Sequence, residues 1–174
     1  KDYGSISSSS TSNVRTARPT INLKSTVKII DGDGTSSNPY TLQDDDDKPQ
    51  NVLLSTRYSG EYIRFGIGEN NLYRIVSHEN GTGTKITSAI PLKANGNYKT
   101  IAFGSNVTFS KDNTIGTFLN GDYLTSGTYL TSDQVNMLED NTTWYLGRVE
   151  QGVNYKLAKY QDTTGSNLTT STTT

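Results

Sequence analysis

The feature that most constrains this chain is a rapid succession of short segments with alternating apolar and polar residues, separated by turns rich in glycine and asparagine. Alternation places the apolar side chains of a strand on one face, and glycine and asparagine accept the positive φ angles of tight turns. Turns that recur roughly every 8 to 12 residues are typical of antiparallel strands. The chain is therefore predicted to be mainly β, as an antiparallel sheet or sandwich-like module.

A hairpin is the clearest local prediction. Residues 61–67 and 71–77 are two alternating segments joined by the turn sequence "GENN". In the second segment, Tyr73 and Ile75 share one face, and Leu72 and Val76 share the other face with Arg74. The sequences "ENGTG" and "ANGN" predict two further turns downstream.

One or two short helices are expected to interrupt the strands. In residues 110–121, Ser110 is a candidate N-cap and Gly121 a candidate stop. Thr131 and Gln134 have the spacing of a capping box, in which the two side chains satisfy each other's main-chain N–H groups. Both helices are predicted to be short.

Residues 18–43 contain the strongest strand signal near the beginning of the chain. Pro19 can start a strand because no ladder donor is needed there, and the sequence "DGDG" supplies a glycine turn before a short closing strand. Four aliphatic residues are expected to set the register of this segment: Ile21, Leu23, Val27 and Ile29. Their burial would contribute on the order of 6 to 12 kcal/mol before conformational entropy is subtracted.

The remaining segments of the chain are assigned to linkers, a tail and a module from their composition. Residues 1–17 are predicted to be a Ser/Thr-rich linker or an extended arm, and residues 163–174 a flexible Thr-rich tail. Residues 44–50 contain the charge run "DDDDK", interpreted as a solvated acidic linker at a module boundary, although it also matches the enteropeptidase recognition sequence and a cloning remnant is the alternative. Residues 51–162 are then a β-rich module.

Several classes of function are disfavoured by composition. The net charge of −1 argues against a nucleic-acid binder, and no apolar run is long enough to predict a membrane span. The chain has no cysteine, and His78 is its only histidine, placed beside a predicted turn. Asp31, Asp33 and Asn38 resemble part of a calcium loop but lack the distal glutamate. We therefore expect no enzyme, no cofactor and no metal.

Residues 18–42, "RPTINLKSTVKIIDGDGTSSNPYTL", resemble the closing signature of exported surface or pilin-like β modules of low-GC Gram-positive bacteria. Residues 62–77 resemble the opening strand pair of such a module, and "FLNGDYL" and "NTTWYLGRV" are similar to its middle, so the resemblance extends over most of residues 18–160. The matching positions of the closing signature are Arg18, Pro19, Leu23, Lys24, Ser25, Val27, Gly32, Gly34, Thr35, Pro39 and Tyr40.

The order of these parts departs from the family, because the closing segment precedes the opening one. Three explanations are open: a fragment that straddles two repeats, a fibre subunit whose leading strand completes the next copy, or a permuted module in which that strand folds back into its own sheet. The first two are preferred, and residues 51–162 would then be incomplete without a partner strand.

The resemblance implies an extracellular location on the cell surface. It predicts a structural subunit of a fibre or pilus-like protein, joined by strand addition to copies of itself or to adjacent modules. The alternative is an adhesin module that binds glycan or host matrix through exposed aromatic residues. The candidates for that binding are Tyr123, Tyr129, Trp144 and Tyr145.

Overall fold

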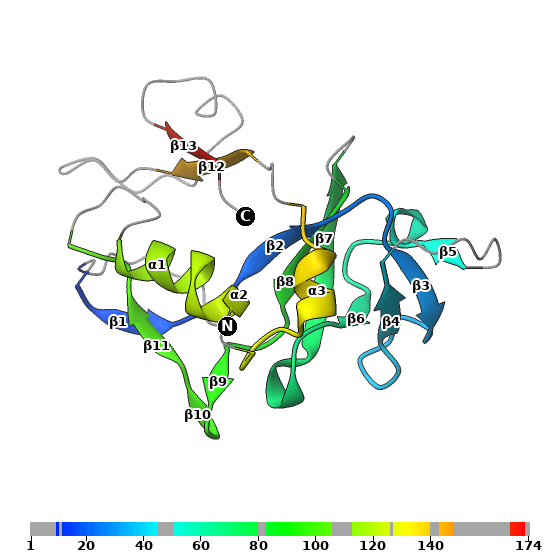
Figure 1. Ribbon diagram of the computed structural model, residues 1–174, viewed down its shortest axis with the longest axis horizontal. Helices are drawn as coiled ribbons and strands as arrows, with labels where there is room; N and C mark the ends of the chain where they lie inside the picture. The colour runs from blue at the N-terminus through cyan, green and yellow to red at the C-terminus, as the bar shows by residue number, and fades with distance from the viewer. Residues whose placement is uncertain are drawn as a thin grey trace, which may run out of the picture.

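The computed structural model describes residue 10 and residues 12–44, 51–79, 83–105, 113–125 and 127–139, together with the backbone of residues 143–147 and 168–172. The chain is mainly β, as predicted, and Figure 1 shows its strands arranged along the long axis with short helices in front of the central ones. The principal sheet has seven strands in the order β2-β8-β7-β6-β4-β3-β5.

The strands of this sheet come from both sides of the predicted boundary at residues 44–50. They are β2 (Thr20–Leu23), β3 (Lys28–Asp31), β4 (Tyr40–Gln43), β5 (Val52–Leu53), β6 (Tyr62–Arg64), β7 (Leu72–Glu79) and β8 (Gly83–Ser88). All neighbours are antiparallel except β4 and β6, which are parallel. Strands that precede and strands that follow residues 44–50 therefore belong to one continuous sheet. This sheet is mixed, whereas the sequence predicted an antiparallel one.

The parallel pair follows from the path of the chain. After β4 the chain passes β3 and adds β5 to its far side, so β5 and β4 both run antiparallel to β3. The short 3-10 helix η1 (Leu54–Thr56) then leads back, and β6 enters beside β4 in the same direction. Parallel neighbours need such a crossover, which a reading of consecutive hairpins does not anticipate.

The predicted hairpins are present. A second 3-10 helix, η2 (Gly68–Asn70), joins β6 to β7, and the strands β9 (Lys93–Ala94) and β10 (Asn97–Tyr98) flank a two-residue turn. In that turn Asn95 has φ 53° and Gly96 has φ 78°. Positive φ at both positions matches the right-handed twist of paired strands, which is why Asn-Gly predicts this hairpin.

Besides the β9–β10 hairpin, two further described strand pairs lie outside the principal sheet. The strand β1 (Val14–Thr16) pairs with β11 (Thr100–Ala102), so part of the predicted N-terminal linker is an ordered arm. The strand β12 (Thr143–Gly147) pairs with β13 (Leu168–Thr172). Residues 153–160, whose sequence "VNYKLAKY" also predicts a strand, lie outside the described residues. Part of the tail expected to be flexible is thus a strand, because main-chain pairing requires no apolar side chain.

Three short helices contribute to the core. They are α1 (Thr114–Asn120), α2 (Asp122–Thr125) and α3 (Ser132–Asn136). α3 begins with the predicted capping box of Thr131 and Gln134. α1 ends at Gly121 as expected, but its N-cap is Asn113, whose side chain accepts the N–H of Gly116. Ser110 lies outside the described residues.

One apolar core joins the sheet to these helices. From the sheet it includes Leu23, Ile63 and Tyr73, and from the region of the helices Phe118 and Leu138. Figure 1 shows α3 in front of the central strands. The segment after α3 also pairs with the edge of β2 that lies away from β8, because the N–H of Glu139 donates to the carbonyl of Asn22 at 2.9 Å. The layering is therefore a sheet with helices on one face, and the opposite face is the outer face.

Candidate functional site

The four aliphatic residues predicted to enter a neighbouring module lie in the sheet of their own chain. Ile21 and Leu23 on β2 pair with β8, and Val27 is fully buried. Ile29 on β3 pairs with β4 and β5 and packs against the core. This arrangement is the third explanation considered above, in which the leading segment folds back. This pairing is possible because β2 can lie antiparallel beside the edge of β8 whether it comes before or after β8 in the chain.

Two of the predicted ligand-binding aromatics are core residues. The side chains of Tyr123 and Tyr129 are only 1% and 5% exposed, and both rings pack against Phe118. The prediction that they form part of an exposed cluster is therefore wrong. Tyrosine suits a wet surface and a packed interior equally well when its hydroxyl finds a partner, so composition alone could not decide. Trp144 and Tyr145 lie on β12, whose side chains are outside the described part of the structure.

A buried pair of hydroxyl groups holds α2 against the sheet. The Oη atoms of Tyr73 on β7 and Tyr123 on α2 are 2.6 Å apart, and both side chains are fully buried. Burial raises the pKa of both phenols, because the charged form loses its hydration. The two hydroxyls therefore stay neutral and serve each other as donor and acceptor.

His78 has a structural environment. Its Nε2–H donates to the carbonyl of Arg57 at 2.6 Å, and its Nδ1 lies 2.9 Å from the hydroxyl of Thr84. Both ring nitrogens are thus engaged, and no described carboxylate contacts the ring. These two contacts tie β7 to β8 and to the loop after η1.

The "DGDG" segment is a self-contained turn. Asp33 accepts the N–H of Thr35 at 2.9 Å, and this hydrogen bond lowers the pKa of its carboxyl group. Gly32 has φ 93°, and a Cβ atom there would collide with the carbonyl of Pro39. Within the described ranges, no three histidine or carboxylate side chains come together as metal ligands. The oxygen atoms of this turn thus bind the turn's own backbone.

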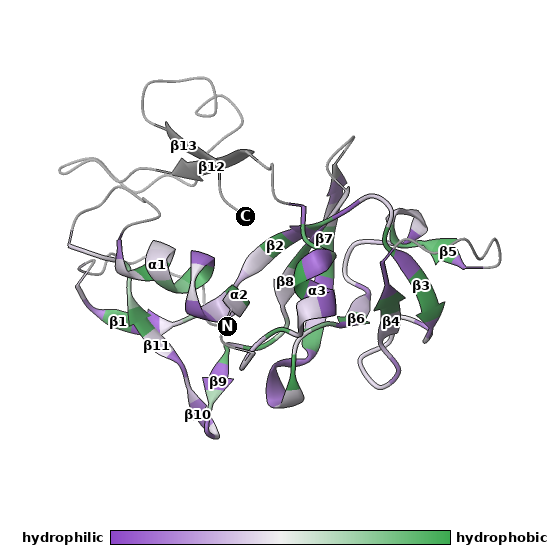
Figure 2. Cartoon of the chain, viewed as in Figure 1, coloured by the Kyte–Doolittle hydropathy of each residue, from purple (hydrophilic) through white to green (hydrophobic). Residues whose placement is uncertain are grey.

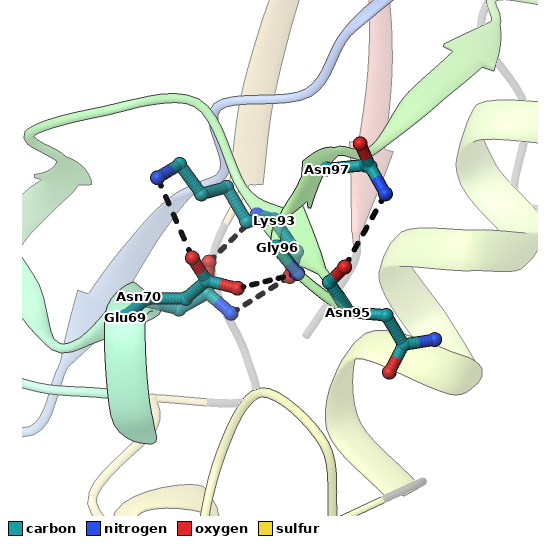
Figure 3. A network of polar contacts seen from close by, with 6 residues as sticks. All are labelled: Glu69, Asn70, Lys93, Asn95, Gly96 and Asn97. Atoms are coloured by element: carbon teal, nitrogen blue, oxygen red, sulfur yellow. Dashed lines mark hydrogen bonds and ion pairs between the residues drawn. The ribbon is translucent and has the colours of Figure 1, made fainter.

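A polar network fastens η2 to the β9–β10 hairpin (Figure 3). Asn70 acts like a strand partner: its Oδ1 accepts the N–H of Lys93 at 2.8 Å, and its Nδ2 donates to the carbonyl of the same residue at 2.9 Å. Glu69 accepts the N–H of Gly96 at 3.1 Å and lies 3.4 Å from the Lys93 ammonium group. Asn70 is 5% exposed, so its two hydrogen bonds are protected from water.

Two strand edges among the described residues carry exposed aliphatic side chains. At one end of the principal sheet, Val52 and Leu53 on β5 are 41% and 40% exposed, and Ile30 on the neighbouring β3 is 44% exposed. Figure 2 shows these strands with hydrophobic residues in green at one end of the molecule. At the other end, Val14 on β1 is 56% exposed. Each of β5 and β1 has a described strand on one side only.

Unpaired strand edges offer main-chain donors and acceptors to another strand. We name the first region the β5 edge (Ile30, Val52 and Leu53) and the second the β1 edge (Val14 and the rest of β1). Figure 1 places β1 and β5 at opposite ends of the long axis. The sequence analysis predicted neither edge. It assigned no strand to Val52–Leu53, and it assigned Val14 to a Ser/Thr-rich linker or extended arm on the basis of composition.

Comparisons of the chain with family models, with curated proteins and with solved structures find no match. The resemblance to Gram-positive surface modules therefore stays a prediction. In the part of the chain that the structure describes, no helix has both the length and the apolar character needed to cross a membrane.

Proposed function

We propose that this chain is a structural module of an extracellular surface fibre, and that copies join head to tail through their strand edges. The observation that carries this proposal is the pair of one-sided strands, β5 and β1, at opposite ends of the long axis, each with exposed aliphatic residues. The extracellular, Gram-positive setting is supported by the resemblance of residues 18–42 and 62–77 to such modules.

The joint differs from the one expected from sequence. β2 and β3 are occupied within their own sheet, so the strand offered to the neighbour is β1 and the edge that receives it is the β5 edge. Main-chain hydrogen bonds between the two strands would provide affinity, and the aliphatic residues would provide register. Because the two surfaces are different, each added copy leaves one free end, which is the geometry of an open filament.

The test compares two matched valine substitutions. Val52 on the β5 edge and Val76 on β7, inside the sheet, are 41% and 42% exposed. We expect the unmodified chain to show concentration-dependent assembly by analytical ultracentrifugation and filaments by electron microscopy. Val52→Lys should be monomeric, because a charge would be desolvated in the joint, and Val76→Lys should assemble like the unmodified chain.

A mixing experiment tests the head-to-tail arrangement. Val14→Lys blocks the β1 edge and Val52→Lys blocks the β5 edge, so each variant keeps one intact surface. Mixed together, they should form a one-to-one dimer that cannot grow. An unmodified chain that stays monomeric at all concentrations, or equal assembly of Val52→Lys and the unmodified chain, would contradict the proposal.

A further inference from the structure

The strands at the two ends of the long axis differ in the sign of their charge. Figure 1 places β1, β9, β10 and β11 at one end and β3, β4 and β5 at the other. The first group is formed by residues 10–19 and 90–105, whose sequence contains two arginines, two lysines and no acidic residue, a formal charge of +4. The second group is formed by residues 24–56, which contain six aspartates and three lysines, a formal charge of −3. We name these two sets of residues the basic end and the acidic end.

The ion pairs of these segments leave the difference in place. At the basic end, Lys93 pairs with Glu69 of η2 at 3.4 Å, which removes one positive charge from that end. At the acidic end, Lys24 pairs with Asp44 at 3.8 Å. Both members of this second pair belong to the acidic end, so its total does not change. The two ends therefore keep formal charges of +3 and −3.

Two cations of the basic end are held in place by neutral groups. Arg18 donates from Nε and Nη2 to the carbonyl of Ser88, at 3.0 and 2.7 Å. The ammonium group of Lys99 lies 5.5 Å from the centre of the Phe118 ring. A carbonyl or an aromatic ring fixes the position of a cation without cancelling its charge. Arg15 lies on β1 itself, the strand offered to the next copy, and its side chain is exposed.

The aspartates of the acidic end flank the β5 edge along the chain. Asp31 directly follows Ile30 of that edge on β3, and both Asp31 and Asp33 in the turn beyond it are exposed. Residues 45–47, which are all aspartates, belong to the segment that joins β4 to β5. Negative charge thus accompanies both strands that form the receiving edge.

We propose that opposite charge orients the fibre joint: the basic end of one copy is attracted to the acidic end of the next, and assembly weakens as the salt concentration rises. This inference rests on the proposed fibre, and the partner is a second copy of the chain. Main-chain groups are the same in every strand, so hydrogen bonding alone allows any two free edges to pair. Like charges oppose the pairing of two basic or two acidic ends, and unlike charges favour the mixed pair. Charge therefore supplies the head-to-tail direction that main-chain hydrogen bonds do not specify.

The mixture of Val14→Lys and Val52→Lys chains isolates one joint, in which the acidic end of the first chain meets the basic end of the second. Its dissociation constant is measured by analytical ultracentrifugation. We expect binding to weaken about tenfold between ~0.01 M salt, where charges interact over roughly 30 Å, and ~0.15 M salt, where they interact over roughly 8 Å. A dimer of equal affinity at both salt concentrations would leave the joint standing and overturn the role of charge, whereas no dimer at either concentration would overturn both proposals.

Neutralising the acidic end should abolish the salt dependence. The substitutions Asp45→Asn, Asp46→Asn and Asp47→Asn, made together in the Val14→Lys chain, remove the formal charge of −3 and leave the aliphatic residues of the β5 edge unchanged. The affinity at low salt should then fall to the value that the unsubstituted pair has at high salt, and further salt should have no effect. A salt dependence as steep as that of the unsubstituted pair would overturn the inference.

At the basic end, a matched pair of arginines separates the charge of the joint from the charge of the whole chain. Arg15→Gln in the Val52→Lys chain should weaken binding at low salt about two- to fivefold, the effect of one exposed charge. Arg15→Lys keeps the charge and should bind like the arginine. Arg64→Gln is the control, because Arg64 is an exposed arginine on β6 in the middle of the sheet, and it should leave the affinity unchanged. Equal weakening by Arg15→Gln and Arg64→Gln, or by Arg15→Gln and Arg15→Lys, would overturn the inference.

Discussion

The buried hydroxyl pair between Tyr73 and Tyr123 allows a sharp test of how the helices are held to the sheet. Its Oη atoms are 2.6 Å apart, and both side chains are fully buried. Substituting either residue with phenylalanine removes one hydroxyl and leaves the other in the core without a partner, which costs about 1 to 3 kcal/mol. Removing both hydroxyls leaves no orphan, so the double variant should be less destabilised than the sum of the two single variants.

The measurement is a double-mutant cycle. The free energy of unfolding of the four proteins is obtained from urea denaturation followed by circular dichroism, with the m-values compared to check that the transition stays two-state. In thermal unfolding, each 1 kcal/mol should appear as a shift of about 2 to 4 °C for a chain of this size. Tyr58→Phe is the control, because Tyr58 is 75% exposed and its hydroxyl contacts the solvent.

The refuting result is additivity. If both single variants lie within about 0.5 kcal/mol of the unmodified protein, the hydroxyls make no energetically significant contact. If the double variant loses the full sum of the single losses, each hydroxyl has its own independent partner. Either outcome would show that the contact between the two hydroxyls does not hold α2 to β7.

Two further predictions concern local structure and pH. Asn70→Ala should lower the free energy of unfolding by about 2 to 3 kcal/mol, because two protected hydrogen bonds to Lys93 are lost. The control Asn95→Gly, at the exposed turn, should change the stability measured in urea by less than about 0.5 kcal/mol. Equal effects of the two substitutions would disprove the role of the network. Burial raises the pKa of Tyr73 and Tyr123 in the folded chain, so the unfolded chain loses these protons first as the pH rises. The stability that the two phenols contribute is therefore present below pH ~10 and falls above it. The Tyr73→Phe/Tyr123→Phe double variant should lose less of its free energy of unfolding between about pH 9 and 11, and a pH profile identical to that of the unmodified chain would refute this linkage.

The edge residues show why the candidate joint could not be located from the sequence. Alternation identifies which residues of a strand share a face, and it correctly grouped Tyr73 with Ile75. That this shared face is the buried one came from the structure. Alternation does not identify which strand ends the sheet. β5 contains only Val52 and Leu53, too short for any periodicity, and it becomes an edge because β3 has already used its other side to pair with β4.

What the sequence alone determined about this protein is the local chemistry: the Asn95-Gly96 hairpin turn, the capping box of Thr131 and Gln134, and the turn at Gly32. Each depends on φ preferences or on side chains within a few residues of the backbone they serve. Only the tertiary structure decided that β2 pairs in its own sheet, that β4 and β6 run parallel, and that Tyr123 is buried. These outcomes depend on which distant segments meet, because pairing partners and burial are properties of the whole packed chain.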